Sequence, residues 1–210
     1  MGIRRVSIME GSIFLFCAWF IWIVTTFFLQ KDNPKRTKYS IYVLIAIVLS
    51  PFKWEWHEIS SSVLLLSILI ISFYSTGRLR WKTTIYIIIA SFFTMLAYAT
   101  YELMAIIDPI WVFIPGPWLK VSILFVLVIL LHKNIVCQIL ILLIGSSTGE
   151  ILLSSILRNY QMEYYIGSLS FFDYLMPGVV GFLSLFYIRM TLVKWEQHVF
   201  MLEKERQKNI

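Results

Sequence analysis

Long apolar stretches recur along this 210-residue chain, separated by short polar or proline-containing connections. A helix needs about 20 apolar residues to cross about 30 Å of hydrocarbon. We predict a membrane span in each of seven stretches: 11–30, 39–52, 59–76, 84–107, 119–131, 135–157 and 169–193. Because lipid offers no partner for a backbone N–H or C=O group, each span must be helical, and the predicted fold is an all-α polytopic transmembrane bundle.

Composition supports this class and excludes others. Hydrophobic residues make up 59% of the chain and charged residues 14%, with a mean hydropathy of +0.79. Soluble domains carry about 45–50% apolar and about 25% charged residues. A water-soluble enzyme, a disordered chain and a secreted disulfide scaffold are therefore excluded. Cys17 and Cys137 both lie in apolar stretches, which is typical of packing residues and not of a redox pair.

The second and fifth stretches are short for a span, so a five-span arrangement in which neither crosses stays open. Residues 1–193 are predicted to form a single transmembrane domain, and residues 194–210 a charged helical tail. Leu192, just before the tail, and Trp195, Val199 and Leu202 within it repeat at helical spacing. The stripe indicates a helix lying on the inner leaflet or, alternatively, docking a cytoplasmic partner.

The distribution of cations predicts the orientation. Seven spans place 13 of the 18 Lys and Arg residues on the side of the C-terminus, which the positive-inside rule assigns to the cytoplasm, and leave the N-terminus outside. The net charge of +6 is then a topogenic excess and not a signal for nucleic acid. Arg4 and Arg5 oppose this orientation, and a translation start at Met9 would remove them. The 13 residues are Lys31, Lys35, Arg36, Lys38, Arg78, Arg80, Lys82, Lys133, Arg189, Lys194, Lys204, Arg206 and Lys208.

Three acids lie inside predicted spans. Glu102, Glu150 and Asp173 fall about 8, 10 and 6 Å below the outer ends of their helices at 1.5 Å per residue. Ionisable groups at such depth usually face the bundle interior or water, so we predict a ligand-binding site at this level with Lys120 and Arg158 as available counter-ions. Glu150 is the leading candidate. The alternative is that the acids reach the interface or are protonated and bonded to a neighbouring helix.

Two small-residue motifs are predicted to mediate helix packing. Gly145 and Gly149 form a G-x-x-x-G pair, and Gly178 and Gly181 follow Pro177. Residues 145–149 also match G-x-S-x-G, but a serine hydrolase needs a strand-to-helix turn and a nearby base, which this apolar segment does not provide. Pro177 is typical of a kinked membrane helix; a broken helix lining a pocket is the alternative.

The sequence contains no P-loop, no H-E-x-x-H, no dinucleotide fingerprint and no metal-spaced Cys/His set. We therefore expect no enzymatic activity, no cofactor and no metal. Residues 108–118, rich in proline and tryptophan, are predicted to lie on the outer interface.

Met9, Glu10, Gly11 and Ser12 precede an aromatic-rich first helix, and with the chain length and the seven-span layout this opening resembles the YphA-type membrane proteins of Bacillus and its relatives. The resemblance implies a multi-pass protein of the bacterial plasma membrane. It implies no biochemical activity and no site residues.

Three hypotheses for function follow. The first is an envelope-associated scaffold or sensor that acts through helix packing and its tail, alone, as a homo-oligomer or with other membrane proteins. The second is a small-solute or ion/proton-coupled carrier that uses the outer carboxylates. The third, a membrane-embedded enzyme, requires the acids or a serine to converge on a water-filled cavity.

Overall fold

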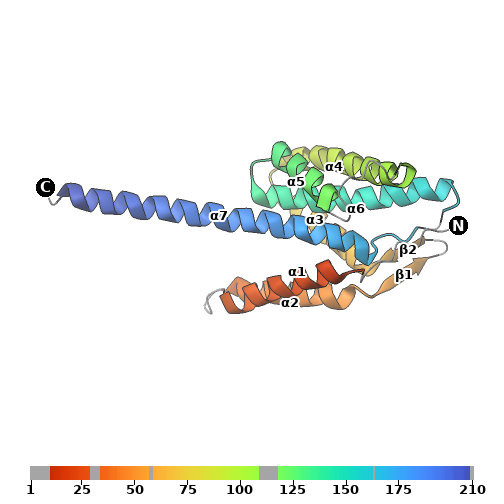
Figure 1. Ribbon diagram of the computed structural model, residues 1–210, viewed down its shortest axis with the longest axis horizontal. Coiled ribbons are helices and arrows are strands. Elements are labelled where there is room, and N and C mark those ends of the chain that lie inside the picture. Colours follow the sequence, from red (N-terminus) through yellow and green to blue (C-terminus); the bar gives the residue numbers. More distant parts are fainter. Residues whose placement is uncertain (1–9, 29–33, 57–58, 109–117, 163, 209–210) are drawn as a thin grey trace.

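The computed structural model describes residues 10–28, 34–56, 59–108, 118–162 and 164–208. Most of these residues are helical, and the predicted all-α class is confirmed. Seven α-helices lie in the described residues: α1 (Ser12–Ile23), α2 (Pro34–Leu49), α3 (Val63–Gly77), α4 (Trp81–Ile107), α5 (Trp118–Leu131), α6 (Ile135–Asn159) and α7 (Leu169–Lys208) (Figure 1).

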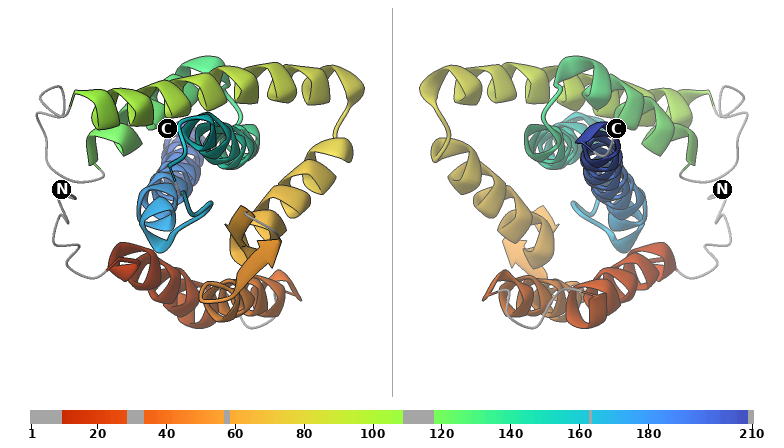
Figure 2. Two further views of the ribbon diagram at one scale, coloured as in Figure 1. Left: turned by 90° about the vertical axis from the view of Figure 1, so that its right-hand side faces the viewer. Right: turned by 90° about the vertical axis from the view of Figure 1, so that its left-hand side faces the viewer.

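Helix α6 lies at the centre of the bundle. The end-on views of Figure 2 show α6 and the first part of α7 inside a partial ring formed by α1, α2, α3, α4 and α5. α6 packs most extensively against α4 and also contacts α3, α5 and α7. Its buried apolar side chains, which form the middle of the core, include Leu140, Ile141, Leu142, Ile144 and Leu153.

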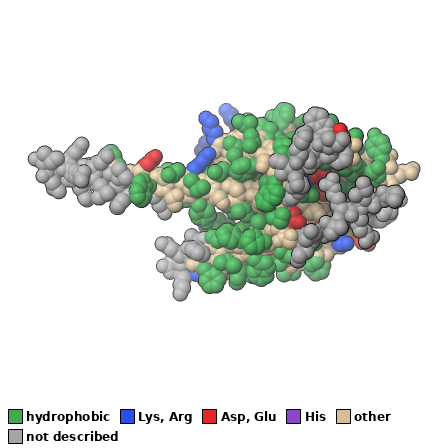
Figure 3. Space-filling view, viewed as in Figure 1, with side chains coloured by type: hydrophobic (Ala, Val, Ile, Leu, Met, Phe, Trp, Pro, Cys, Tyr) green, Lys and Arg blue, Asp and Glu red, His purple; other side chains and the backbone are tan. Residues whose placement is uncertain are grey.

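The outward faces of the surrounding helices are strongly apolar. Phe16, Trp81 and Leu130 are 74%, 78% and 79% exposed, and green hydrophobic side chains cover much of the face seen in Figure 3. A surface of this kind is not compatible with water, since soluble monomers rarely expose large contiguous apolar patches. In the part of the chain that the structure describes, three helical segments are long and apolar enough to cross a membrane: Trp81–Ile107, Ile135–Asn159 and Leu169–Gln197.

One element departs from the predicted helices. Residues 59–62, expected to open the third span, form strand β2 (Ile59–Ser62), which pairs antiparallel with β1 (Lys53–Trp56). Ser60, Ser61 and Ser62 favour this outcome because serine hydroxyls compete with helical backbone bonds. The backbone of Ile166 extends the hairpin by bonding to Ser60 and Ser62 on the edge of β2. The hairpin thus binds the α6–α7 connection at Ile166 to one end of the bundle, which we call the hairpin end.

Two other boundaries also differ from the prediction. α1 ends at Ile23, and the π-helix η1 (Val24–Phe28) continues the first apolar stretch. α2 begins at Pro34, five residues before the predicted start at residue 39. Proline is favoured at the first helical position because its missing N–H would be unpaired there in any case, so a helix can begin within the charged connection.

Helix α7 runs without interruption through Pro177 and past residue 193, the predicted boundary between membrane domain and tail. Its 40 residues correspond to about 60 Å at 1.5 Å per residue. Figure 1 shows its second half projecting beyond the other helices, at what we call the tail end. The predicted interfacial residues 109–117, the Met9 start and the side chains of Val199 and Leu202 lie outside the described residues.

Candidate functional site

Four helices bring polar side chains together near the hairpin end. Glu102 lies near the end of α4, Lys120 near the start of α5 and Glu150 in the half of α6 nearer the hairpin end. α4 and α6 run in the same direction and α5 runs opposite to both, which places these positions at one level, as the sequence predicted for the two glutamates. Three tyrosines complete the set, which we call the polar cluster: Tyr98, Glu102, Lys120, Glu150, Tyr164 and Tyr174.

Lys120 forms a buried ion pair with Glu102. The lysine is 2% exposed, and its Nζ lies 3.0 Å from the centroid of the Tyr174 ring and 4.8 Å from that of Tyr98. The faces of these rings attract a desolvated ammonium group, so the lysine has a carboxylate and two aromatic rings in place of water. Lys120 is thus the counter-ion of Glu102, and this ion pair joins α4 to α5.

Glu150 is fully buried and receives three hydrogen bonds. The Tyr98 hydroxyl donates to Oε2 at 2.5 Å, the Tyr164 hydroxyl donates to Oε1 at 2.9 Å, and the Gly167 N–H donates to Oε1 at 3.3 Å. A carboxylate without partners would be very costly in such a place, whereas three donors satisfy most of its acceptor capacity. Glu150 therefore links α6 to α4 and to the α6–α7 connection.

The Tyr164 hydroxyl lies in that connection, beyond the end of α6. Burial raises the pKa of this hydroxyl, and the nearby charge of Glu150 raises the pKa further. Tyr164 consequently keeps its proton at neutral pH and remains a donor to the carboxylate.

Small residues make this arrangement sterically feasible. A Cβ on Gly149 would lie 2.8 Å from Cδ1 of Tyr98, and one on Gly145 would lie 2.5 Å from Cβ of Thr94. The G-x-x-x-G pair thus allows α6 to approach α4 closely, and this close approach brings Tyr98 within hydrogen-bonding distance of Glu150. Gly167, with φ of +72°, lies against Leu65 where an added Cβ would come within 2.8 Å. A side chain at Gly167 would displace the N–H that bonds Glu150.

Gly178 and Gly181 face two different helices. An added Cβ would meet Cδ2 of Leu142 on α6 at 3.0 Å from Gly178, and Cε2 of Phe125 on α5 at 2.9 Å from Gly181. These two glycines therefore let α7 approach α6 and α5 together.

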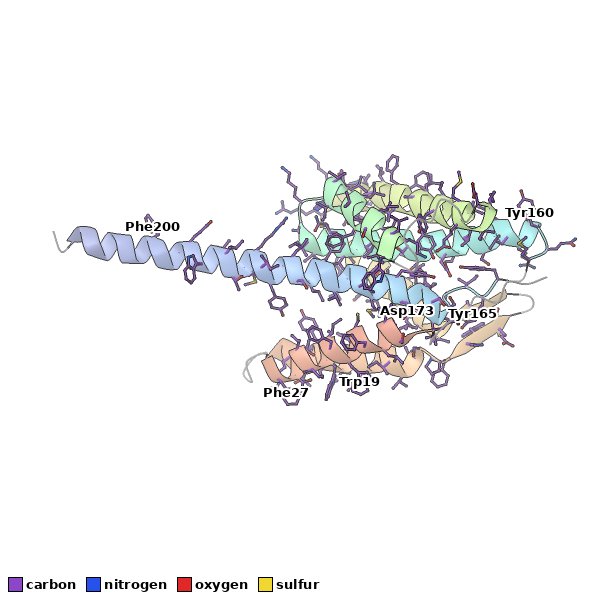
Figure 4. The ribbon with its side chains drawn as sticks, viewed as in Figure 1. Trp19, Phe27, Tyr160, Tyr165, Asp173 and Phe200 are labelled. Carbon is purple, nitrogen blue, oxygen red and sulfur yellow. The ribbon has the colours of Figure 1, made fainter. Side chains whose placement is uncertain are left out.

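Asp173 does not join the polar cluster, in which the sequence had placed it. Its Oδ2 and Oδ1 accept hydrogen bonds from the backbone N–H groups of Gly11 and Phe14, each at 2.8 Å. The carboxylate therefore caps the start of α1, where the helix dipole also favours negative charge. Figure 4 shows Asp173 in the first turns of α7, facing α1. It links α7 to α1 instead of joining Glu102 and Glu150 in one ligand site.

The hydroxyls of residues 146–148, which precede Glu150 on α6, do not bond to its carboxylate. Thr148 donates to the carbonyl oxygen of Ile144 at 2.7 Å, while the buried Oγ atoms of Ser146 and Ser147 have no protein partner. Ser146 lines a cavity of about 10 Å³, close to the volume that one water molecule needs. His132 lies at the tail end, where its Nδ1 accepts from the Asn134 N–H at 2.9 Å, so it cannot serve Ser147 as a base.

Sequence reasoning missed the three tyrosines and Gly167. Tyr98 and Glu102 are four residues apart and share a face of α4, which was a readable signal. Nothing local in the sequence distinguishes Tyr164 from its neighbour Tyr165. No group of three or more His, Cys, Asp or Glu side chains arranged for a metal occurs among the described residues.

A larger pocket opens at the hairpin end, next to the polar cluster. It has a volume of about 740 Å³ and lies between β2, α3, α6 and the α6–α7 connection. The Tyr164 side chain lines this pocket while its hydroxyl bonds Glu150. Tyr164 thus separates the buried carboxylate from the pocket.

The apolar exterior, the membrane-length helices and the charged groups paired inside the bundle define an integral membrane protein built as a helical bundle. The chain belongs to the YphA-like integral membrane protein family, whose sequence model matches residues 10–208. It is 25% identical over 177 residues to the uncharacterized protein YphA of Bacillus subtilis (strain 168), covering 82% of this chain and 85% of that relative. The resemblance seen in the sequence is confirmed. No solved structure matches the chain significantly.

Proposed function

We propose that this protein is a non-enzymatic scaffold or sensor of the bacterial plasma membrane, which connects its outer end to partners at its cytoplasmic tail. One observation carries the proposal: α7 is a single helix that bears Asp173 and Tyr174 at the hairpin end and projects beyond the bundle at the tail end. A displacement at the polar cluster would move the projecting segment, because a continuous helix transmits shift and rotation along its axis.

The proposal includes an orientation, with seven crossings, the hairpin end outside and the tail in the cytoplasm. The positive-inside rule supports it, and blue Lys and Arg side chains gather in Figure 3 at the end of the bundle from which α7 projects. The buried pairing of Lys120 strengthens the charge asymmetry, because this lysine is removed from the outer surface. Periplasmic and cytoplasmic reporters fused to the two ends test the orientation; reporters active in the same compartment would contradict it.

Partner binding is tested by deleting residues 192–210. Chemical crosslinking in native membranes should recover a partner, or a second copy of the chain, with the full chain and lose it with the truncated chain. Glu150→Gln should retain the crosslink because its amide oxygen can accept from one tyrosine hydroxyl while its NH2 group donates to the oxygen of the other. Crosslinking that survives the deletion but fails in Glu150→Gln would overturn the proposal.

The second candidate function is a small-solute or ion/proton-coupled carrier. It is favoured by the contact of Tyr164 with both Glu150 and the 740 Å³ pocket, which would open a route to the carboxylate if the phenol moved. A carrier predicts that Glu150→Gln abolishes solute- or proton-dependent stability in reconstituted vesicles. Unchanged dependence in this variant would exclude the carrier.

A further inference from the structure

The pocket at the hairpin end has the size of a small-molecule site, since such sites measure about 300–1,000 Å³. Its walls come from parts of the chain nearly 100 residues apart: the hairpin and the start of α3 on one side, and the end of α6 and the α6–α7 connection on the other. The tertiary fold therefore creates it.

Polarity changes along the pocket in the direction of the helix axis. On α6, Ile151 lies deepest, Ser155 follows one turn outward, and Arg158 lies at the end of the helix. Ile151 and Arg158 are about 10 Å apart along the axis at 1.5 Å per residue. Across the pocket, Leu65 and Leu66 form an apolar base below the serines of β2. A membrane lipid has the same gradient, with its acyl chain inward and its head outward.

The outer part of the pocket suits a phosphate group. Arg158 places a guanidinium group in the wall, and its five N–H donors allow it to keep its contact within the protein and still bind an anion. Hydroxyls such as that of Ser154 add neutral hydrogen-bonding groups, whereas the Ser155 hydroxyl donates to the carbonyl oxygen of Ile151 at 3.0 Å. Arg with several hydroxyls is a common set of phosphate ligands in proteins.

The backbone at the rim has an unusual conformation. Gln161, which lines the pocket, has φ of +58°, a region that side chains other than Gly and Asn rarely occupy. It ends α6 in a Schellman motif, because the N–H groups of Met162 and Gln161 bond to the carbonyl oxygens of Leu157 and Arg158. Glycine is the usual residue at this position of a Schellman motif. A glutamine at this position places a polar side chain at the pocket, and its positive φ costs backbone strain.

We infer that this pocket binds one phosphate-bearing membrane lipid, with the head at Arg158 and an acyl chain along Leu65 and Ile151. The lipid contacts Tyr164, whose hydroxyl bonds Glu150, so occupancy of the pocket bears directly on the polar cluster. The inference of a lipid site depends only on the pocket. The further idea that bound lipid affects the position of α7 rests on the proposed function.

The test uses the full chain in detergent and native mass spectrometry with added phosphatidylglycerol. We expect one bound phosphatidylglycerol per chain, weaker binding of zwitterionic phosphatidylcholine, and no displacement by soluble glycerol 3-phosphate. Displacement by glycerol 3-phosphate at the same concentration would show that a free phosphate compound is the ligand and would overturn the lipid assignment.

Two variants locate the site. Arg158→Gln should weaken binding about tenfold, the loss expected for one charge-assisted hydrogen bond, and Arg189→Gln at the tail end is its matched control. Ile151→Trp should abolish binding by filling the apolar base, with the outward-facing Ile71→Trp as control. If Arg158→Gln and Ile151→Trp both fold with native helix content and keep wild-type affinity, the inference is wrong.

The two proposals fail separately. If Ile151→Trp loses the lipid but tail crosslinking is unaffected by lipid in the full chain, the lipid site stands and the sensing role fails. If tail deletion abolishes crosslinking while the pocket variants bind lipid normally, the scaffold role stands and the lipid site is excluded.

Discussion

The two ends of the bundle are built on different principles. At the hairpin end, buried charges and hydrogen bonds join α1, α4, α5, α6 and α7, through Lys120 to Glu102, Glu150 to Tyr98 and Asp173 to the start of α1. At the tail end α7 leaves the bundle, and its described side chains from Phe186 to Phe200 are exposed. Figure 4 shows this contrast between Asp173 and Phe200 on the same helix.

The contrast shows which interactions fix the positions of helices relative to one another in a membrane. Apolar contacts gain little over lipid contacts, so polar bonds and close backbone approach decide which helices associate. The hairpin end contains both, and we expect substitutions there to cost far more than substitutions on the projecting part of α7.

The largest effect is expected from Lys120→Met. Removing the ammonium leaves Glu102 as a partly buried carboxylate without its partner, and the unfolding free energy in detergent should fall by about 3 kcal/mol. Adding Glu102→Gln should restore part of the loss. The exposed Lys82→Met is the control, and an equal loss there would contradict a special role for the hairpin end.

Gly145→Ala should lower the same free energy by about 2 kcal/mol, because its Cβ would lie 2.5 Å from Cβ of Thr94 and force α4 away from α6. Gly77→Ala is the matched control, since nothing lies within 4 Å of its added Cβ. In a Thr94→Gly background, which removes this Cβ, Gly145→Ala should cost clearly less than in the wild-type chain, and an unchanged cost would mean that the clash lies elsewhere.

Asp173→Ala should cost about 1–2 kcal/mol through loss of the cap on α1. The effect should be local: hydrogen exchange of the Gly11 and Phe14 amides should accelerate, while exchange in α6 stays slow. Asp173→Asn should show a smaller effect because its amide oxygen still accepts one bond. Unchanged exchange at Gly11 in Asp173→Ala would contradict the capping role.

Trp195→Ala should have the smallest effect, within about 0.5 kcal/mol in thermal or chemical unfolding, because this side chain on the projecting part of α7 is 71% exposed. A larger loss would show that the isolated chain packs its tail and would weaken the contrast between the two ends.

Hydropathy and spacing predicted the helices well. The segments at 84–107 and 135–157 correspond closely to α4 and α6, because runs of Ile, Leu and Phe of that length have one stable conformation in lipid. Prediction was weakest where short polar runs interrupt the pattern. The serines at 60–62 form a strand, and the charged connection before residue 39 begins α2 at Pro34.

The candidate site was predicted in part. Glu102, Glu150 and Lys120 do lie together, since residues at equal depth on adjacent helices meet. Asp173 was grouped with them on the same argument and bonds elsewhere, because depth gives no information about which face of a helix a residue occupies relative to its neighbours. Gly167 and Tyr164 could not be foreseen from any periodicity, as both lie in an irregular connection.

The amino-acid sequence by itself determined the solvent of this protein, its helical class and the level at which its acids lie, because hydropathy and helical rise are properties of single segments. Only the tertiary structure decided the partners: lysine with Glu102, two tyrosines and a glycine N–H with Glu150, and the first turn of α1 with Asp173. Pairing depends on the rotation of each helix about its axis, which close contacts between whole helices set and which no single segment encodes.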